Sequence, residues 1–274
     1  MARSLGLGGE EGPGDGGALK LALLQFSPRP GDVRANLATL VRLAGRGADE
    51  GARLLVAPEL CTTGYYMGPV FGRLAEPLDG PTVGVVRELA RRRGVHVALG
   101  MAERAATGAL HDSAVLVGPG GAIGAGRKSR LWDREVGVFA PGAGAVLATD
   151  VGAVGLLVCY DLEHPDLVQA LVDAGAQLIV AVAAFSDLRL WRATLAARAR
   201  EAAVPIVAAN RTGHEAAAVF CGHSMAVAAD GSVVAEAGDR GGVTVASVRV
   251  APAPTALRRQ RRPLDPRLLL PEYG

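Results

Sequence analysis

Three residues of complementary chemistry, Glu59, Lys128 and Cys159, each lie at or just past the end of an apolar run. A free thiol has a pKa of about 8.5, so it needs a base or a nearby cation to act as a nucleophile at neutral pH. A carboxylate can supply the base and an ammonium group the cation. Among 29 basic residues, Lys20 and Lys128 are the only lysines, so a lysine kept in mid-chain suggests a chemical reason. If the fold brings the three together, they form a nucleophile with its base and its cation.

Each residue also has an interpretation without chemistry. An isolated cysteine can be a small core residue, Glu59 can cap the next segment, and Lys128 can lie on the surface. Histidine is the usual partner of a catalytic thiol, and His164, which follows Cys159 closely, is the best placed of the five histidines. No cluster of His, Cys and Asp has the spacing of metal ligands, so we expect no metal site.

The elements that would position these residues can be placed from apolar runs and turn signals. The ends of strands in layered α/β folds are where sites collect, and all three residues lie at such ends. The alternation of strands and helices indicates α/β layering with a mixed sheet or two packed sheets. We expect strands at 19–26, 53–59, 95–103, 154–158, 177–185 and 205–210, helices at 32–48, 82–93, 166–174 and 190–203, and hairpins at 113–127 and 225–236.

Composition limits the class of protein. The chain has 274 residues, half of them hydrophobic, and a net charge of +2, which is typical of a globular protein without a polyanionic partner. A basic cluster near the C-terminus contains Arg258, Arg259, Arg261 and Arg262. We interpret it as a solvated tail, and nucleic-acid binding is the less favoured interpretation. No apolar run approaches the ~20 residues of a membrane span, and the N-terminus lacks the apolar region of a secretory signal.

The domain organisation and the cellular location follow from the same features. Residues 1–17 are glycine-rich and acidic, and we expect a disordered extension there. Residues 18–274 contain neither a linker nor a repeat, and we expect one domain with a C-terminal arm from about residue 251. Three cysteines without a disulfide framework fit a reducing cytoplasm.

Several short motifs together resemble the nitrilase, or carbon–nitrogen hydrolase, superfamily. They occur in the order typical of that superfamily and extend over roughly residues 19–250. The motifs are Pro58-Glu59-Leu60 with Thr63-Gly64-Tyr65, Arg127-Lys128, Phe139-Ala140-Pro141-Gly142, Gly155-Leu-Leu-Val-Cys159-Tyr-Asp, Arg198-Ala199-Arg200-Glu201, and Ala209-Asn210.

This resemblance implies a four-layer α-β-β-α sandwich, assembled as a homodimer or a larger homo-oligomer, and a Glu–Lys–Cys hydrolase that needs no cofactor. Cys159 would be the nucleophile and Glu59 the general base. Lys128 and the backbone N–H of Tyr160 would stabilise the oxyanion. The superfamily has a second glutamate after the lysine, for which Glu135 is our choice and Asp133 the alternative.

The segment CYDLEHPDL is most similar to a branch of amidases that acts on ω-amino amides or is R-selective. Arginine is common in related branches where this chain has Glu163, so a carboxylate there could favour a substrate with an amine or guanidine; a helix-end carboxylate that complements the dipole is the alternative. Tyr65, Ser186 and Asn210 are further candidates for the substrate pocket. His164 and Asp166 replace a phenylalanine and a glutamate of this branch, and Ala202 stands where relatives often have asparagine.

The sequence therefore predicts an amidase that hydrolyses a small carboxamide, an ω-amino or guanidino alkanamide, to an acid and ammonia through a cysteine thioester. A nitrilase or an N-carbamoyl amine hydrolase would use the same three residues. A catalytically idle homologue that serves as a binding module is the alternative from another class, and its expected mark, loss of one of the three residues, is not seen.

Overall fold

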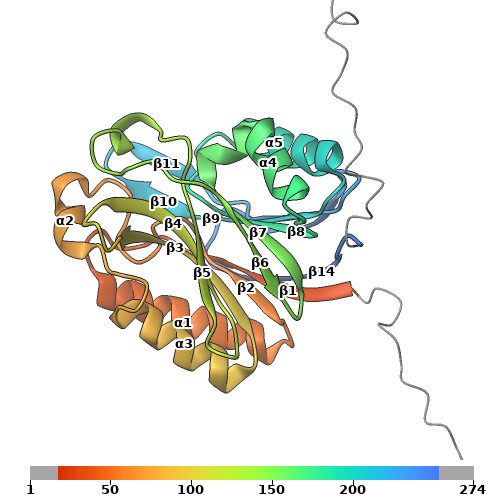
Figure 1. The fold of residues 1–274 in the computed structure, drawn as a ribbon, viewed down its shortest axis with the longest axis horizontal. Coiled ribbons are helices and arrows are strands. Elements are labelled where there is room, and N and C mark those ends of the chain that lie inside the picture. The colour runs from red at the N-terminus through yellow and green to blue at the C-terminus, as the bar shows by residue number, and fades with distance from the viewer. Residues whose placement is uncertain (1–17, 253–274) are drawn as a thin grey trace, which may run out of the picture.

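Two six-stranded sheets face each other in the computed structural model, which describes residues 18–252 (Figure 1). The predicted N-terminal extension and the arginine cluster of the predicted C-terminal arm lie outside the described residues. The first sheet has the order β14-β1-β2-β3-β4-β5. Its strands are β1 (Ala18–Gln25), β2 (Leu54–Val56), β3 (His96–Arg104), β4 (Leu110–Val117), β5 (Ile123–Arg127) and β14 (Gly242–Arg249).

The second sheet has the order β13-β12-β9-β8-β7-β6. In each sheet three strands are parallel, namely β1, β2 and β3 in the first and β7, β8 and β9 in the second, and antiparallel strands complete the edges. The strands of the second sheet are β6 (Ala145–Thr149), β7 (Gly152–Val158), β8 (Leu178–Ala183), β9 (Ile206–Asn210), β12 (Met225–Val227) and β13 (Val233–Glu236), and a separate hairpin is formed by β10 (Thr212–Glu215) and β11 (Ala218–Cys221).

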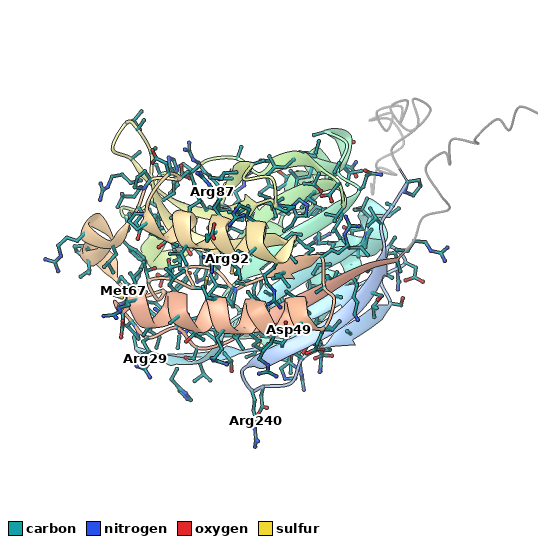
Figure 2. The ribbon with its side chains drawn as sticks, turned by 90° about the horizontal axis from the view of Figure 1, so that it is seen from below. Arg29, Asp49, Met67, Arg87, Arg92 and Arg240 are labelled. Carbon is teal, nitrogen blue, oxygen red and sulfur yellow. The ribbon has the colours of Figure 1, made fainter. Side chains whose placement is uncertain are left out.

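Helices cover the outer face of each sheet. Figure 2 shows α1 (Val33–Asp49) and α3 (Pro81–Arg93) side by side under the first sheet, where Arg93 and Asp49 form an ion pair between them. On the other side, α4 (Pro165–Asp173) and α5 (Leu188–Ala202) cover the second sheet. The remaining helical segments are α2 (Phe71–Leu74) and the short 3₁₀ turns η1 (Gly68–Val70), η2 (Asp133–Glu135) and η3 (Cys159–Glu163). The order helix, sheet, sheet, helix is the α-β-β-α sandwich that the resemblance implied.

Local sequence explains where the helices begin and end. Asp32 precedes α1 and accepts a hydrogen bond from the N–H of Ala35, and Asp187 does the same for α5. The helix α3 starts with Pro81 and stops at Gly94, whose φ of 65° is left-handed. The strands β7, β8 and β9 are covered on both faces, so they read as continuous apolar runs rather than as alternating patterns.

The helices and strands expected from sequence form at the predicted places, to within a few residues. The strands β6, β10, β11 and β14 were not predicted from the sequence. Of these, β14 pairs with β1 over its whole length, although more than 200 residues separate the two. Local sequence patterns cannot predict a pairing between segments so far apart. No helix within residues 18–252 is long and apolar enough to cross a lipid bilayer.

Candidate active site

The structure brings Glu59, Lys128 and Cys159 together at one end of the sandwich. Glu59 follows β2 and Lys128 follows β5 in the first sheet, whereas Cys159 follows β7 in the second. Lys128 Nζ donates a hydrogen bond to Glu59 Oε1 at 2.6 Å. The charges of Glu59 and Lys128 both act on the Cys159 thiol. The carboxyl ends of the parallel strands therefore meet as the sequence predicted, and the site is shared between the two sheets.

Cys159 lies at a sharp change of direction. Its φ of 47° is left-handed, a conformation that is strained by about 1–2 kcal/mol for a residue other than glycine. This turn ends β7 and begins η3, and the thiol accepts a hydrogen bond from the N–H of Ala184, with 3.5 Å between nitrogen and sulfur. Burial and the negative charge of Glu59 raise the pKa of Cys159 well above its ordinary value. The resting side chain is therefore a thiol, and its proton must be removed by a base as it attacks.

Lys128 is only 1% exposed and is surrounded by carboxylates. Its ammonium group lies 2.5 Å from Glu135 Oε1 and 3.5 Å from Asp112 Oδ2, in addition to the contact with Glu59. Burial alone would lower the pKa of Lys128, but the negative charge of Glu59, the largest opposing influence, and its acidic surroundings raise that pKa well above the ordinary value. Lys128 thus remains a cation and occupies the place that a metal ion would take among Glu59, Asp112 and Glu135.

The glutamate after the lysine is Glu135, and the alternative Asp133 lies on the surface with 61% of its side chain exposed. Glu135 Oε1 accepts hydrogen bonds from Lys128 Nζ and from the Tyr65 hydroxyl, both at 2.5 Å. Its other oxygen accepts the N–H of Trp132 at 2.7 Å. Glu135 therefore fixes one side of the lysine and connects it to Tyr65.

A close backbone approach places Glu59. The loop that carries Glu59 crosses β3 at Gly100, where an added Cβ would lie 2.4 Å from the Glu59 Cα. The Gly100 N–H donates to the Pro58 carbonyl at 3.0 Å. On the other side, the Glu59 N–H donates to the Ala183 carbonyl of the second sheet at 3.3 Å. The base is thus held between the two sheets by its own backbone.

Two acidic residues without a predicted role hold segments of the site. Asp161 accepts hydrogen bonds from the N–H groups of Ser129 and Arg130 and so fixes the turn after Lys128. Glu215 Oε1 accepts the N–H groups of Tyr65 and Tyr66 at 2.8 and 2.6 Å. For Asp161 the sequence contained an indication of a role in the site, because Asp161 belongs to the Cys-Tyr-Asp motif.

Glu215 is held in turn by Arg211, and we call these two residues the Arg211–Glu215 clamp. Arg211 is fully buried, forms an ion pair with Glu215, and stacks its guanidinium 4.2 Å from the centre of the Phe220 ring. A chain of contacts therefore runs from Arg211 through Glu215 to Tyr65, and from the Tyr65 hydroxyl to Glu135 and Lys128.

Of the predicted substrate-binding residues, only Tyr65 lies directly against the charged cluster. Tyr160 is the second residue of η3, and its ring packs edge-on against Trp132 and His164. His164 is thus an aromatic neighbour of Tyr160, and the carboxylate whose charge acts on the Cys159 thiol is Glu59. Glu163 is partly buried at the end of the same turn, where burial raises its pKa. Ser186 is exposed in the loop before α5.

Asn210 lies in the interior, at the end of β9. Its amide is fully buried and bonds to the Phe185 N–H and to the carbonyls of Phe185 and Gly222, and it also donates to Cys221 Sγ. These hydrogen bonds connect β9 with neighbouring segments of the chain. Asn210 therefore has a bracing role in the structure.

A cavity of about 100 Å³ lies beside Tyr65 and Glu135. Its wall is mainly apolar and aromatic, with Arg134 as a second charged residue. Glu59, Lys128 and Cys159 are not among the residues that line this cavity, which reaches the charged cluster through Tyr65 and Glu135. The lining residues are Tyr65, Tyr66, Gly68, Phe71, Arg134, Glu135, Val138 and Phe139.

Comparison with known proteins identifies the family of this chain. Residues 20–255 match the family model of carbon-nitrogen hydrolases. The chain is 37% identical over 225 residues to an (R)-stereoselective amidase from a Pseudomonas species, covering 80% of this chain and 81% of that one. It is 32% identical over 226 residues to a nitrilase from Pyrococcus abyssi, covering 81% and 86% of the two chains.

A solved structure of an amidase mutant from Nesterenkonia sp. AN1 superposes with a TM-score of 0.80 at 29% identity, covering 85% of this chain and 91% of that one. In that structure the acetamide moiety of fluoroacetamide is bonded to the active-site cysteine. The family match spans most of the chain, and the identity to the (R)-stereoselective amidase is above 30%. The chain therefore belongs to the carbon–nitrogen hydrolase family of the nitrilase superfamily, and it is an enzyme that hydrolyses non-peptide C–N bonds.

Proposed function

We propose that the enzyme hydrolyses a small carboxamide to a carboxylic acid and ammonia through a thioester on Cys159. The observation that carries the proposal is the position of Lys128, whose ammonium is bonded to Glu59 and Glu135 and interacts with the Cys159 thiol. This arrangement supplies a nucleophile, a base and a permanent cation in one buried site.

The first half of the reaction forms the thioester. Glu59 accepts the Cys159 proton while sulfur attacks the amide carbon, and the carbonyl oxygen becomes an oxyanion. Lys128 and the backbone N–H of Tyr160 stabilise this oxyanion; loss of one such donor costs about 3–4 kcal/mol in comparable sites. The C–N bond then breaks, and the nitrogen takes the proton from Glu59 and leaves as ammonia.

The second half releases the acid. A water molecule gives a proton to Glu59 and attacks the thioester carbon, and the same donors stabilise the second oxyanion. The C–S bond breaks, the carboxylic acid leaves, and the sulfur recovers its proton from Glu59. Glu59 is thus base and acid in turn, which suits a carboxylate that is buried yet held by only one lysine hydrogen bond.

For the substrate class, we propose an ω-amino or guanidino alkanamide. The support is Glu163, a partly buried carboxylate in the same 3₁₀ turn as Cys159, where burial raises its pKa. A 3₁₀ turn rises about 2 Å per residue, so Glu163 lies about 8 Å along the axis from Cys159. This separation suits a substrate whose cation is a few methylene groups from the amide.

The experiment is ammonia release by the purified protein from a matched panel, with Cys159→Ala as control. The panel contains 5-aminopentanamide, 4-guanidinobutanamide, the neutral pentanamide, a nitrile and an N-carbamoyl amine. Cysteine-dependent release that favours the two cationic amides supports the proposal. Activity on the nitrile or the carbamoyl compound alone would retain the mechanism and replace the substrate class, an outcome of interest because a nitrilase is among the relatives.

The role of Glu163 is tested by Glu163→Gln, which keeps the shape and removes the charge. We expect kcat/KM to fall about tenfold or more for 5-aminopentanamide and by less than about twofold for pentanamide. Equal losses for both amides would give Glu163 a structural role at the end of η3.

We also propose that the enzyme is cytoplasmic and works as a homodimer or larger homo-oligomer. The support for the first part is that Cys61, Cys159 and Cys221 are all free thiols. The second part rests on the family resemblance, and sedimentation velocity of the full chain tests it, with a monomer at micromolar concentration as the contrary result.

A further inference from the structure

A third carboxylate, Asp112, lies in the active site without a role in the reaction described above. It belongs to β4, its side chain is fully buried, and its Oδ2 is 3.5 Å from Lys128 Nζ. Asp112, Glu59 and Glu135 each offer an oxygen within 4.8 Å of the others. The site therefore contains three buried carboxylates around a single ammonium group.

The three carboxylates differ in the hydrogen bonds that they receive. Glu135 accepts from Lys128, from Tyr65 and from the N–H of Trp132. Glu59 accepts from Lys128 through Oε1, while its Oε2 has no partner within residues 18–252. Neither oxygen of Asp112 has a hydrogen-bond partner in that part of the chain.

An ionised carboxylate that is buried without donors is strongly unfavourable. A proton on Asp112 removes this cost, because the resulting O–H group can donate to the unpartnered Oε2 of Glu59. One proton thus satisfies both residues that lack partners.

The charges around Asp112 lead to the same result. The titratable groups that face it are Glu59 after β2, Lys128 after β5 and Glu135 in η2. The next buried cation in the described chain is Arg211, which is already paired with Glu215. Three adjacent negative charges exceed the single positive charge of Lys128, and this excess favours a proton on one of the carboxylates.

The group that becomes neutral is the one with the fewest donors. Burial and then the charge of Glu59 raise the pKa of Asp112 well above its ordinary value. Burial raises the pKa of Glu135 as well, but Glu135 has three donors, and their hydrogen bonds and the charge of Lys128 favour its anion.

We propose that Asp112 is a positioning residue that stays protonated and donates its O–H to Glu59 Oε2, turning the base toward Cys159. The inference rests on the proposed role of Glu59 as the base. A neutral Asp112 orients Glu59 without adding a negative charge beside a thiol that has to lose its proton. An ionised Asp112 would oppose both the thiolate and the oxyanion.

The proton is observed directly by infrared difference spectroscopy of the unliganded protein. The C=O stretch of a carboxylic acid is separate from that of a carboxylate. In the difference between the parent and Asp112→Asn, we expect the loss of one carboxylic-acid band at neutral pH. The matched control is Glu103→Gln, which removes a buried carboxylate on the neighbouring strand that accepts hydrogen bonds from Ser113 and Arg127 and is therefore ionised. This control should lose no such band.

The positioning role is tested by the activity of two variants on the best amide of the panel. Asp112→Ala removes the donor, and we expect kcat to fall by about tenfold to a hundredfold with a smaller change in KM. Asp112→Asn keeps an N–H donor at the same place, so it should recover at least about tenfold of that loss. The acid limb of its pH profile should lie within about 0.3 units of the parent's, because no charge has been removed.

Three results would overturn the inference. They are a carboxylic-acid band that persists in Asp112→Asn, an acid limb that moves to lower pH by a unit or more in that variant, and full activity of Asp112→Ala. The infrared measurement needs no substrate, so a wrong substrate class leaves it unaffected. It also needs only the isosteric variant, so it holds if Asp112→Ala fails to fold.

Discussion

At the scale of single residues, the site combines groups whose charges depend on one another. Lys128 remains a cation because carboxylates surround it, and Cys159 remains a thiol because it is buried beside Glu59. Cys159 is therefore not a thiolate in the resting site. In the proposed mechanism, the thiol becomes reactive only when Glu59 takes its proton, which restricts its chemistry to molecules that fit beside Glu59.

This restriction predicts selective labelling among the three cysteines. Burial raises the pKa of Cys61 to about 12 and that of Cys221 to about 11, so both remain protonated at about pH 8. Fluoroacetamide at that pH should therefore add one acetamide group, on Cys159, as measured by intact mass and peptide mapping. Cys159→Ala should remain unmodified, and labelling of Cys61 or Cys221 at a similar rate would contradict the assignment.

A second prediction concerns the cost of keeping Asp112 buried. Its pKa is raised in the folded protein above the unfolded value of about 3.9, so its contribution to stability is fully present below that pH and is lost as the pH rises through the folded pKa. Asp112→Asn has no such dependence. Its free energy of unfolding relative to the parent should increase between about pH 4 and 7, by at most ~1.4 kcal/mol per pH unit for one proton. Urea denaturation at several pH values measures this difference, and a constant difference would contradict it.

At the scale of elements, Glu59, Lys128 and Cys159 lie just after strands, in the connecting segments. Close packing holds these segments in place. The loop of Glu59 rests on Gly100 of β3, where no side chain fits. We expect Gly100→Ala to destabilise the protein by about 1–3 kcal/mol through overpacking and to reduce kcat more than KM, because Glu59 shifts. Gly84→Ala is the matched control, since an added Cβ there meets no atom within 4 Å. Thermal unfolding and steady-state kinetics distinguish the two, and equal effects would exclude a role of the close approach.

Variants of the Arg211–Glu215 clamp can distinguish its contribution to the stability of the fold from its contribution to the position of Tyr65. Glu215→Ala leaves Arg211 buried without its partner, which should cost about 3–5 kcal/mol, and frees the N–H groups of Tyr65 and Tyr66. The double variant Arg211→Met/Glu215→Leu should regain much of that stability but not the kcat, because no acceptor holds Tyr65. Glu215→Gln keeps the acceptor and should retain most of the kcat. Recovery of kcat by the double variant would show that the clamp acts on stability alone.

Some residues of the site could be predicted from the sequence, and others could not. Glu59, Lys128 and Cys159 could be found because each lies at the end of an apolar strand and matches a family motif. The roles of Asp112 and Glu215 could not be predicted from the sequence. The role proposed for Asp112 follows from the absence of hydrogen-bond donors to its oxygens within residues 18–252, which only the structure shows. The role of Glu215 follows from its hydrogen bond with the N–H of Tyr65, 150 residues away in the chain. Asn210 ends β9, and position alone did not reveal that its amide bonds to the backbone of Phe185.

At the scale of the whole molecule, the active site depends on the packing of the two sheets. Glu59 and Lys128 come from the first sheet and Cys159 from the second, and one apolar cluster extends through strands of both. Gln25, at the end of β1, also connects them, since its amide bonds to Ser224 before β12 and to the Gly238 and Arg240 carbonyls. Activity therefore reports on the contact between the sheets as well as on the catalytic residues.

We accordingly expect activity and secondary structure to be lost together in urea. Leu156 of β7 is fully buried in the apolar cluster that both sheets share, so Leu156→Ala should lower the free energy of unfolding by about 2–5 kcal/mol without touching the site. The midpoints for amide hydrolysis and for far-ultraviolet circular dichroism should coincide in the parent, and both should move to lower urea by the same amount in the variant. If hydrolysis disappears at a lower urea concentration than the dichroism signal, the residues of the site separate while the sheets stay intact, and the loops around Glu59 and Lys128, rather than the sandwich, would limit the stability of the active enzyme.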